Sequence, residues 1–270
     1  MNTKRILWGQ AGKILRVDLS NRKISTQDTE EYAQRFIGGR TINSYIMLKE
    51  MNPTTKWSDP ENMLIFGAGT LVGTLAPGAC RVSIETKSVY NNGKGSANFG
   101  GHFGPELKYA GFDHVVIVGK SEKPVYLWLC DGQAEIRDAS SVWGKTTYET
   151  EVILRQELGD CRVEVASIGP AGENRVRGSC IFNNPGKAAA GSGVGCVMGD
   201  KKLKAIAVRG HGGIRIANPE RFMAAVDTAL AKVKASHHTE DWRKGAVEAR
   251  FSPESPLWNG AGCVRNGQDQ

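Results

Sequence analysis

The chain of 270 residues lacks the features of several large protein classes. No apolar run approaches the roughly 20 residues that a membrane-spanning helix needs, so we expect no membrane span. The amino-terminal residues MNTKRILWGQAGK contain too short an apolar stretch for a secretory signal peptide. No low-complexity segment occurs, and 40% of the residues are hydrophobic. The chain is therefore long and apolar enough to bury a core.

The sequence also lacks cysteines at the close spacing of metal-binding or redox motifs. The six cysteines are scattered along the chain, without a CxxC pair and without histidines at metal-ligand spacing. This pattern is typical of reduced, mostly buried thiols and predicts a cytoplasmic protein. Within this chain it offers neither a zinc motif nor the four ligands of an iron–sulfur cluster. The six positions are Cys80, Cys130, Cys161, Cys180, Cys196 and Cys263.

Aromatic residues are few, at 7%, although the formal net charge is +7. Nucleic-acid-binding proteins usually gather Lys and Arg together with aromatic side chains on one surface. Here the basic residues are spread along the whole chain, which favours a bland basic surface. We therefore expect no nucleic-acid partner, and we keep contact with a phosphate-bearing ligand or an acidic partner as a role for a few of the charges.

Glycine, in contrast, is abundant with 33 residues, and it marks turns between predicted elements. Helical segments broken at Gly38-Gly39 are expected over 30–51. Thr146 and Glu149 predict a capping box for a helix that ends at Gly159, and Asn218 followed by proline predicts another helix start. Apolar patterns predict a hairpin over 14–26 and strands over 63–66, 81–86, 115–118, 125–130, 134–137, 163–168 and 206–208.

Two segments, 96–119 and 188–210, resemble each other and form an internal repeat. Each is predicted to be a small-residue loop, a short helix and a strand. Backbone amides at such glycine loops bind anions when a helix N-terminus follows. The repeat therefore predicts a pseudo-twofold unit with two related anion sites, suited to a ligand with two phosphate-bearing halves. The equally weighted alternative is that the glycines only allow close packing of helices on sheets. The corresponding pairs are Ala97 and Ala188, Gly100 and Gly191, and Gly104 and Gly195.

Three polar residues beside these loops are candidates for binding the same ligand. Arg81 favours bidentate contacts with phosphate, and Lys187 offers a cation directly before the second loop. Asn98 offers either its side chain or its backbone carbonyl, which is a ligand for hard cations. Residue type alone favours an ordinary surface role for each of them over a binding role.

Six collinear strings in the sequence resemble the N-terminal domain of the aldehyde ferredoxin oxidoreductase family, the tungsten- or molybdenum-pterin enzymes. They span about four-fifths of the chain in the same order as in the family, which makes the resemblance specific. The strings are ILRVDLS at 14–20, GAGTLVGTLAPGACR at 67–81, ANFGGHFGPELKYAGFD at 97–113, EIRDASSVWGK at 135–145, ASIGPAGEN at 166–174 and AAAGSGVGCVMGDKKLKAIAVRG at 188–210.

The resemblance implies an α+β fold of two β-sheets with helices and a pseudo-twofold internal duplication, which forms the base of a bis-pterin site. It implies that residues 1–215 are the pterin-cradling N-terminal domain. Residues 216–270 would then be the start of a truncated helical second domain.

The resemblance also implies a set of cofactor-binding residues. The backbone carbonyls of Asn98 and Ala188 would hold a magnesium ion that bridges the phosphates of the two pterins. Lys187 stands where family members typically carry arginine, and it lacks the guanidinium fork that grips phosphate. Ala190 stands where a glycine is usual. The pterin-contacting positions fall on Arg81, Asn98 and Gly100 in the first half and on Lys187, Ala188 and Ala190 in the second.

The implied function is that of a tungstopterin- or molybdopterin-dependent oxidoreductase, which converts an aldehyde to a carboxylic acid and passes electrons to ferredoxin or another electron-transfer protein. We expect no catalytic residue within this chain, and a 4Fe-4S cluster only if a missing C-terminal part supplies its ligands. A separate chain with the remaining domains and a second copy of this chain are further expected partners. The alternative is a truncated or split-subunit module that binds pterin or a partner chain without turnover.

Overall fold

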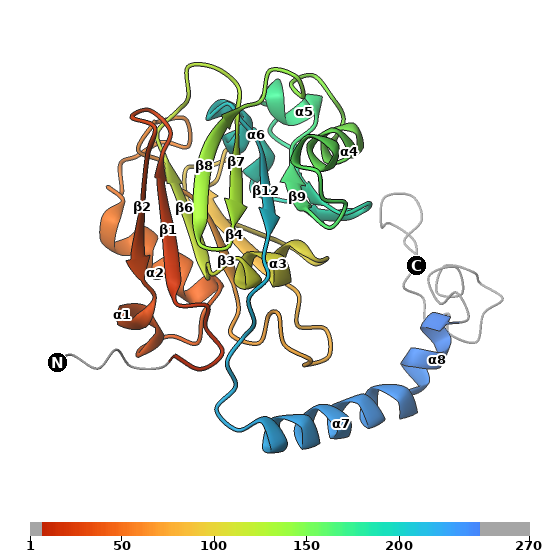
Figure 1. Cartoon of the computed structure of the whole chain (residues 1–270). Coiled ribbons are helices and arrows are strands. Elements are labelled where there is room, and N and C mark those ends of the chain that lie inside the picture. Colours follow the sequence, from red (N-terminus) through yellow and green to blue (C-terminus); the bar gives the residue numbers. More distant parts are fainter. Residues whose placement is uncertain (1–6, 244–270) are drawn as a thin grey trace, which may run out of the picture. The chain divides into compact units, whose positions relative to one another are not determined.

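The computed structural model describes residues 7–243 (Figure 1). The chain divides into two compact units between Ala217 and Asn218. The first unit contains two mixed β-sheets of six strands each, together with helices, which is the α+β class predicted above. No helix in the described range is long and apolar enough to cross a membrane.

The elements of the first unit fall into two halves of similar order. The first half contains β1 (Lys13–Asp18), β2 (Lys23–Asp28), α1 (Glu30–Ala33), α2 (Arg40–Glu50), β3 (Leu64–Ala68), β4 (Val82–Lys87), β5 (Lys94–Phe99), α3 (Phe103–Tyr109) and β6 (His114–Val118). The second half contains β7 (Val125–Cys130), β8 (Gln133–Asp138), α4 (Thr147–Leu158), β9 (Glu164–Ser167), α5 (Pro170–Glu173), β10 (Ile181–Asn183), β11 (Lys187–Ala189), α6 (Val194–Asp200) and β12 (Leu203–Arg209). The second unit contains α7 (Pro219–Ala235) and α8 (His237–Arg243).

The two sheets have the same topology. Their strand orders are β2-β1-β6-β3-β4-β5 and, read in the same direction, β8-β7-β12-β9-β10-β11. In each sheet the first strand of the opening hairpin is parallel to the last strand of that half, and every other pairing is antiparallel. The predicted duplication is therefore confirmed, and it covers both halves rather than the glycine-rich segments alone.

The strand register changes one predicted correspondence between the two repeat segments by one residue. Gly104 and Gly195 occupy the second position of α3 and α6, as predicted. In the sheets, however, Ala188 pairs across the strands as Asn98 does, so Asn98 rather than Ala97 is its structural counterpart. The reason is that the connection between strand and helix is one residue longer in the second half. The segments predicted as loops also contain the short strands β5 and β11.

The unit is layered around one main core. Side chains from both sheets and from α3 and α6 form the largest apolar cluster, among them Phe66, Phe103, Val194 and Ile206. A second cluster lies between the first sheet and α2, and a third lies between the second sheet and α4. Both sheets are therefore buried on two faces, which explains why every residue of strands such as β3 and β12 is buried.

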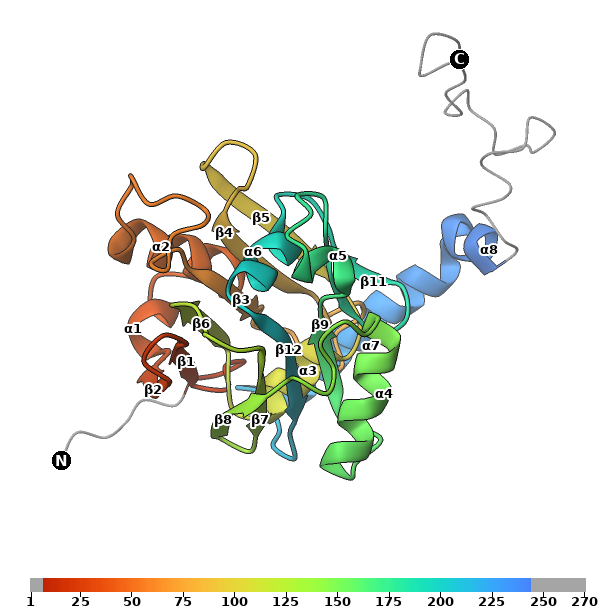
Figure 2. The same ribbon diagram turned by 90° about the horizontal axis from the view of Figure 1, so that it is seen from above.

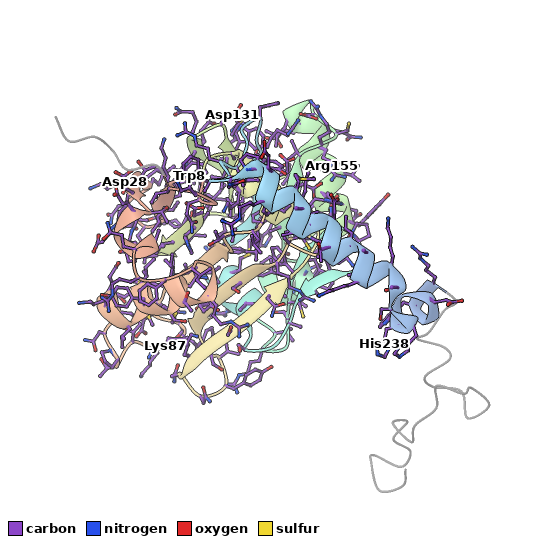
Figure 3. All side chains as sticks on the ribbon, turned by 90° about the horizontal axis from the view of Figure 1, so that it is seen from below. Trp8, Asp28, Lys87, Asp131, Arg155 and His238 are labelled. Carbon is purple, nitrogen blue, oxygen red and sulfur yellow. The ribbon has the colours of Figure 1, made fainter. Side chains whose placement is uncertain are left out.

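Reciprocal hydrogen bonds join the two halves. The N–H of Ser121, after β6, donates to the carbonyl of Lys201 at the end of α6, at 3.1 Å. The N–H of Gly212, after β12, donates to the carbonyl of Tyr109 at the end of α3, also at 3.1 Å. In each case a backbone N–H of one half bonds a carbonyl at the C-terminal end of the helix in the other half. These bonds join the two halves into one unit. Figure 3 shows them side by side, with Lys87 at the end of β4 in one and Arg155 on α4 in the other.

Local capping signals are borne out by the structure. Thr146 Oγ1 accepts the N–H of Glu149 at 3.2 Å, and the Glu149 carboxylate accepts the N–H of Thr146 at 2.8 Å, which completes the predicted capping box. The helix ends at Gly159 with a φ of 69°, a left-handed conformation that glycine adopts without strain. Asn218 caps α7 through its side chain, and proline follows at the first helical position.

Candidate functional site

The inner edges of the two sheets meet at β5 and β11, which lie side by side (Figure 2). We call this junction the strand seam, and it comprises 94–100 and 187–192. Ser192 crosses it: the N–H of Ser96 donates to Ser192 Oγ at 3.0 Å, and this hydroxyl lies 3.3 Å from the carbonyl oxygen of Ser96. One side chain of the second half thus bonds the free edge of β5.

The six predicted cofactor-binding residues all lie on or beside the strand seam. Arg81 directly precedes β4, the neighbour of β5, and the other five belong to the two seam segments. The structure thus collects residues from two distant parts of the chain, although their roles are not tested by this placement. Asn98, Gly100 and Ala188 are half-buried, whereas Arg81, Lys187 and Ala190 are exposed.

Two backbone carbonyls are directed into the seam. Along an extended strand, the N–H and C=O of alternate residues point to the same side. The N–H and the C=O of Ser96 both point toward Ser192, on the side of β5 away from β4. The N–H and the C=O of Asn98, two residues further along the strand, therefore point to the same side. The N–H of Lys187 donates to the carbonyl of Asn184, within the β10–β11 hairpin. Because successive residues point to opposite sides, the N–H and the C=O of the next residue, Ala188, point away from β10 and toward β5. The carbonyls of Asn98 and Ala188 therefore face the same junction.

The seam also carries positive charge. The guanidinium of Arg81 donates a hydrogen bond from Nη1 to Asn98 Oδ1, which holds this cation beside β5. Lys187 adds an exposed ammonium group at the start of β11. Carbonyl oxygens are ligands for hard cations such as Mg²⁺, and Arg and Lys bind phosphate. This set of groups fits a phosphate-bearing ligand together with a divalent cation.

Two of the amides near the helix starts already have partners within the protein. The N–H of His102, before α3, already donates to Asn184 Oδ1 at 2.9 Å. The N–H of Gly195 in α6 already donates to the carbonyl of Ser179 at 3.2 Å. These two amides are therefore not available to an anion, and the seam offers carbonyls and cationic side chains in their place.

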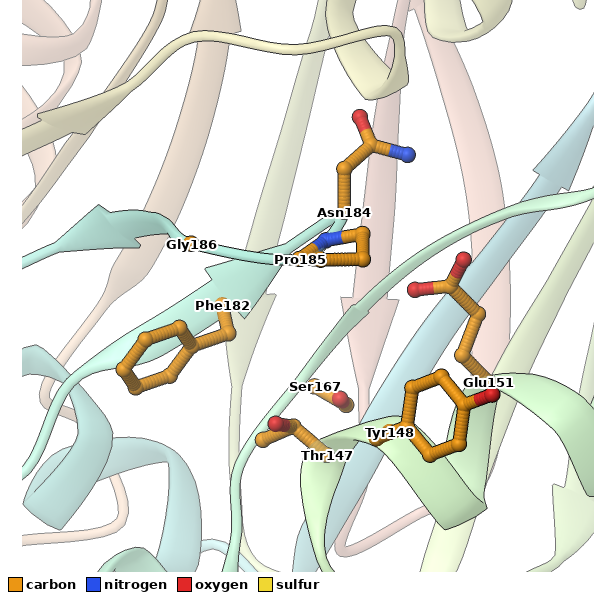
Figure 4. A pocket seen from close by; sticks show the side chains of 8 residues that line it. All are labelled: Thr147, Tyr148, Glu151, Ser167, Phe182, Asn184, Pro185 and Gly186. Carbon is orange, nitrogen blue, oxygen red and sulfur yellow. The ribbon is translucent and has the colours of Figure 1, made fainter.

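A cavity of about 230 Å³ lies beside the seam, between α4 and the β10–β11 hairpin (Figure 4). Sequence reasoning did not predict it, because its walls come from elements that are distant in the chain. Burial raises the pKa of the Glu151 carboxyl in its wall, while Arg155, with Nη1 at 2.8 Å, opposes that shift. The lining residues are Thr147, Tyr148, Glu151, Ser167, Phe182, Asn184, Pro185 and Gly186.

Side-chain metal ligands do not gather anywhere in residues 7–243: no group of three or more His, Cys, Asp or Glu is placed to hold a metal ion. The five cysteines within that range are free thiols. A cation at the seam would therefore depend on backbone carbonyls and on the ligand's own oxygens.

Comparison with known proteins identifies the class. The family described as "Aldehyde ferredoxin oxidoreductase, N-terminal domain" matches residues 14–210, which are nearly all of the first unit. The chain is 48% identical over 229 residues to the tungsten-containing aldehyde ferredoxin oxidoreductase of Pyrococcus abyssi, a match that covers 84% of this chain and 38% of that protein. The fold is thus that of the amino-terminal domain of an oxidoreductase class. The chain belongs to the aldehyde ferredoxin oxidoreductase family.

Other relatives extend the comparison. The chain is 36% identical over 222 residues to the aliphatic sulfonate oxidoreductase, WOR-like subunit, of Pyrococcus furiosus, covering 76% of this chain and 35% of that one. A solved structure, the active site complex BamBC of benzoyl coenzyme A reductase with 1,5-dienoyl-CoA, contains a chain that matches with a TM-score of 0.83 and 38% identity, over 85% of this chain and 35% of that one. The chain thus spans less than two-fifths of the length of these relatives.

Proposed function

We propose that this chain is the pterin-cradling N-terminal portion of a tungsten- or molybdenum-dependent oxidoreductase of the aldehyde:ferredoxin type. The tungsten-containing relative at 48% identity supports the cofactor class. On this proposal the complete enzyme oxidises an aldehyde to a carboxylic acid, and ferredoxin or another electron-transfer protein accepts the electrons. We place it in the cytoplasm, in keeping with the free thiols of the described range.

The proposal is supported above all by the strand pairing around Asn98 and Ala188, which turns both carbonyls toward the strand seam. In our proposal these two oxygens hold a magnesium ion that bridges the phosphates of two pterins. Arg81 and Lys187, one beside each strand, bind those phosphates by charge-assisted hydrogen bonds. Gly100 and Ala190 follow the two strands and leave the backbone accessible to the cofactor. The duplicated topology then matches a cofactor with two similar halves.

The chain's own residues have a binding and orienting role in this proposal. The bound metal–pterin group supplies the redox chemistry, and the protein supplies its position and electrostatic surroundings. We assign no catalytic residue within the chain. A 4Fe-4S cluster needs four ligands, so a further part of the protein or a separate chain would have to supply them. Partner chains are consistent with the relative named as a subunit and with the solved two-component complex, and a second copy of this chain is an alternative partner.

The decisive experiment measures tungsten, molybdenum and pterin in the full chain purified from its native host. We expect near-stoichiometric metal and pterin, and about tenfold weaker pterin retention in Arg81→Ala, because a charged hydrogen bond to phosphate is lost. Arg221→Ala, which alters an exposed arginine of the second unit, is the matched control and should retain pterin fully.

Two results would contradict the proposal. Unchanged retention in Arg81→Ala would refute the role assigned to that side chain. A wild-type chain without metal and without pterin would overturn the cradle itself. Pterin without tungsten or molybdenum would instead favour the module that binds pterin without turnover.

A further inference from the structure

A cluster of polar side chains is buried beneath α2, on the outer face of the first sheet. Asn43 of α2, Glu85 of β4 and His114 of β6 each have 0% exposed surface. Most of their surroundings on this face are apolar, with Ile42 and Ile65 in the same layer. Burying a carboxyl group in such a layer is costly unless hydrogen-bond donors surround it. The partners of Glu85 therefore decide what the cluster does.

Donors from two elements meet the Glu85 carboxylate. Asn43 Nδ2 donates to Glu85 Oε2, and Ser96 Oγ of β5 donates to Glu85 Oε1 at 2.9 Å. Asn43 Nδ2 also lies 3.1 Å from the carbonyl oxygen of Ser83. Because the amide nitrogen of Asn43 donates to Glu85, its oxygen accepts from His114 Nδ1 at 2.7 Å, which assigns the proton of the imidazole to Nδ1.

Positive groups at the margin partly balance the carboxylate. Arg40 Nε, at the start of α2, lies 3.6 Å from Glu85 Oε1 and has a half-exposed side chain. Burial raises the pKa of Glu85, whereas the hydrogen bonds from Asn43 and Ser96 and the charges of Lys94 and Arg40 lower it. Burial also lowers the pKa of His114 to about 4, so this imidazole is neutral near pH 7.

The cluster lies directly behind the strand seam. In the register of β4 and β5, Glu85 faces Ser96 and Ser83 faces Asn98, so these four residues form two neighbouring cross-strand pairs on one face. The Glu85 carboxylate bonds one member of the first pair, and Asn43 bonds the backbone of one member of the second. Ser96, two residues before Asn98 on β5, and Ser83, the cross-strand neighbour of Asn98 on β4, are thereby both bonded to the cluster beneath α2.

We propose that Glu85 is a positioning residue for Asn98. Through Ser96, and together with Asn43, it fixes the end of β5 so that the Asn98 carbonyl and the side chain that anchors Arg81 stay at the seam. This inference rests on the proposed function, because it assigns Glu85 to the same phosphate and magnesium site without any contact of its own with the ligand.

A glycine on the neighbouring strand β3 leaves space for the side chains of the cluster. A Cβ atom at Gly67 would lie 2.4 Å from Asn43 Oδ1 and 2.6 Å from His114 Nδ1, so a glycine at this position of β3 leaves room for both side chains. In the second half the register places Ser167 at the equivalent position and Asn184 at that of Glu85. At the position of the Glu85 carboxylate the second half thus has an amide, and Asn184 Nδ2 donates to the buried Glu164 carboxylate at 2.6 Å.

The experiment compares the full chain with Glu85→Leu and with Glu85→Gln. In Glu85→Leu we expect faster amide hydrogen exchange over 94–99 and about tenfold weaker pterin retention, an effect typical of residues that orient a ligating group. Glu85→Gln keeps an oxygen for Ser96, and Asn43 and His114 can reverse their hydrogen bonds to match it. We expect this variant to restore most of both properties.

Val116→Ala is the control for a loss of stability alone, since Val116 is buried on the same sheet face but on β6, away from β5. It should lower the unfolding temperature and leave pterin retention and exchange over 94–99 unchanged. Slow exchange over 94–99 in Glu85→Leu would overturn the positioning role, and so would full pterin retention. Arg81→Ala separates the two proposals: if it releases pterin while Glu85→Leu does not, only the positioning role fails. A wild-type chain without pterin overturns both.

Discussion

The two halves of the first unit share a topology but differ in what they bury beneath their outer helices. Beneath α2 the first half buries the Glu85, Asn43 and His114 cluster. At the equivalent place beneath α4, the second half has the cavity lined in part by Ser167 and Phe182. The same backbone thus supports a filled, hydrogen-bonded cluster in one copy and a pocket with polar residues in its wall in the other.

The buried ion pairs show the same contrast with the charges reversed. Asp113, just before β6, pairs with Lys108, with Nζ and Oδ1 3.3 Å apart and both side chains fully buried. The equivalent residue at the start of β12 is Lys204, and it pairs with Glu173. Strand pairing and apolar layers therefore define this duplicated fold, whereas the polar interior is free to diverge between copies. That freedom allows a carboxylate, Glu85, behind one edge strand and an amide, Asn184, at the equivalent position of the other half.

The largest expected effect on stability comes from removing one member of the first ion pair. Asp113→Ala leaves Lys108 buried without its counter-charge and removes acceptors for the N–H groups of Ala11 and Gly12. We expect a loss of about 3–5 kcal/mol in the free energy of unfolding, measured with urea. Glu122→Ala, at an exposed acid of the same unit, should change it by less than about 0.5 kcal/mol. A loss in Asp113→Ala no larger than in that control would show that the pair contributes nothing.

The two halves should also differ in how their stability depends on pH, because only the first half has a histidine, His114, at this buried position. Its folded pKa of about 4 lies below the ordinary value of 6.5, mainly because of burial, with Lys108 acting in the same direction and Asp113 against it. The unfolded chain therefore binds the proton first, so this stability is complete above pH 6.5 and is lost as the pH falls toward 4. The full effect is about 3 kcal/mol.

The measurement for His114 is the free energy of unfolding between pH 4 and pH 7. His114→Ala gives this position the residue of its counterpart Ala205, and it should flatten the slope across this range. An equally steep slope in wild type and variant would assign the acid sensitivity to other groups.

The smallest expected difference concerns helix capping. α4 begins with a complete capping box at Thr146, whereas α2 begins at Gly39 without a side-chain cap. Thr146→Ala should lower the free energy of unfolding by about 1 kcal/mol. Thr41→Ala, in the first turn of α2, should cost less, since its hydroxyl bonds only the carbonyl of Gly38. Equal costs would show that the box adds nothing to α4.

Much of the fold could be predicted because its signals are local. The hairpin of β1 and β2, the break at Gly38-Gly39 and the capping box depend on residues a few positions apart. The short strands β5, β10 and β11 escaped prediction. In β5 and β11, small residues such as Gly95, Ala188 and Ala189 have little β-propensity and become strands only through pairing with neighbours, whereas β10 has only three residues, too few to show an apolar alternation. The resemblance nevertheless led to the residues that the structure collects at the seam.

In the sequence by itself, the family resemblance implied the class and the glycine-rich repeat indicated the duplication. Capping residues and glycine turns determined both ends of α4 and the start of α7, because such signals act over short stretches of chain. Only the tertiary structure decided that the Asn98 and Ala188 carbonyls face one junction and that Glu85 lies buried behind it. The physical reason is that the direction of a carbonyl at a sheet edge, and the burial of a carboxylate, depend on which distant strands and helices pack against them.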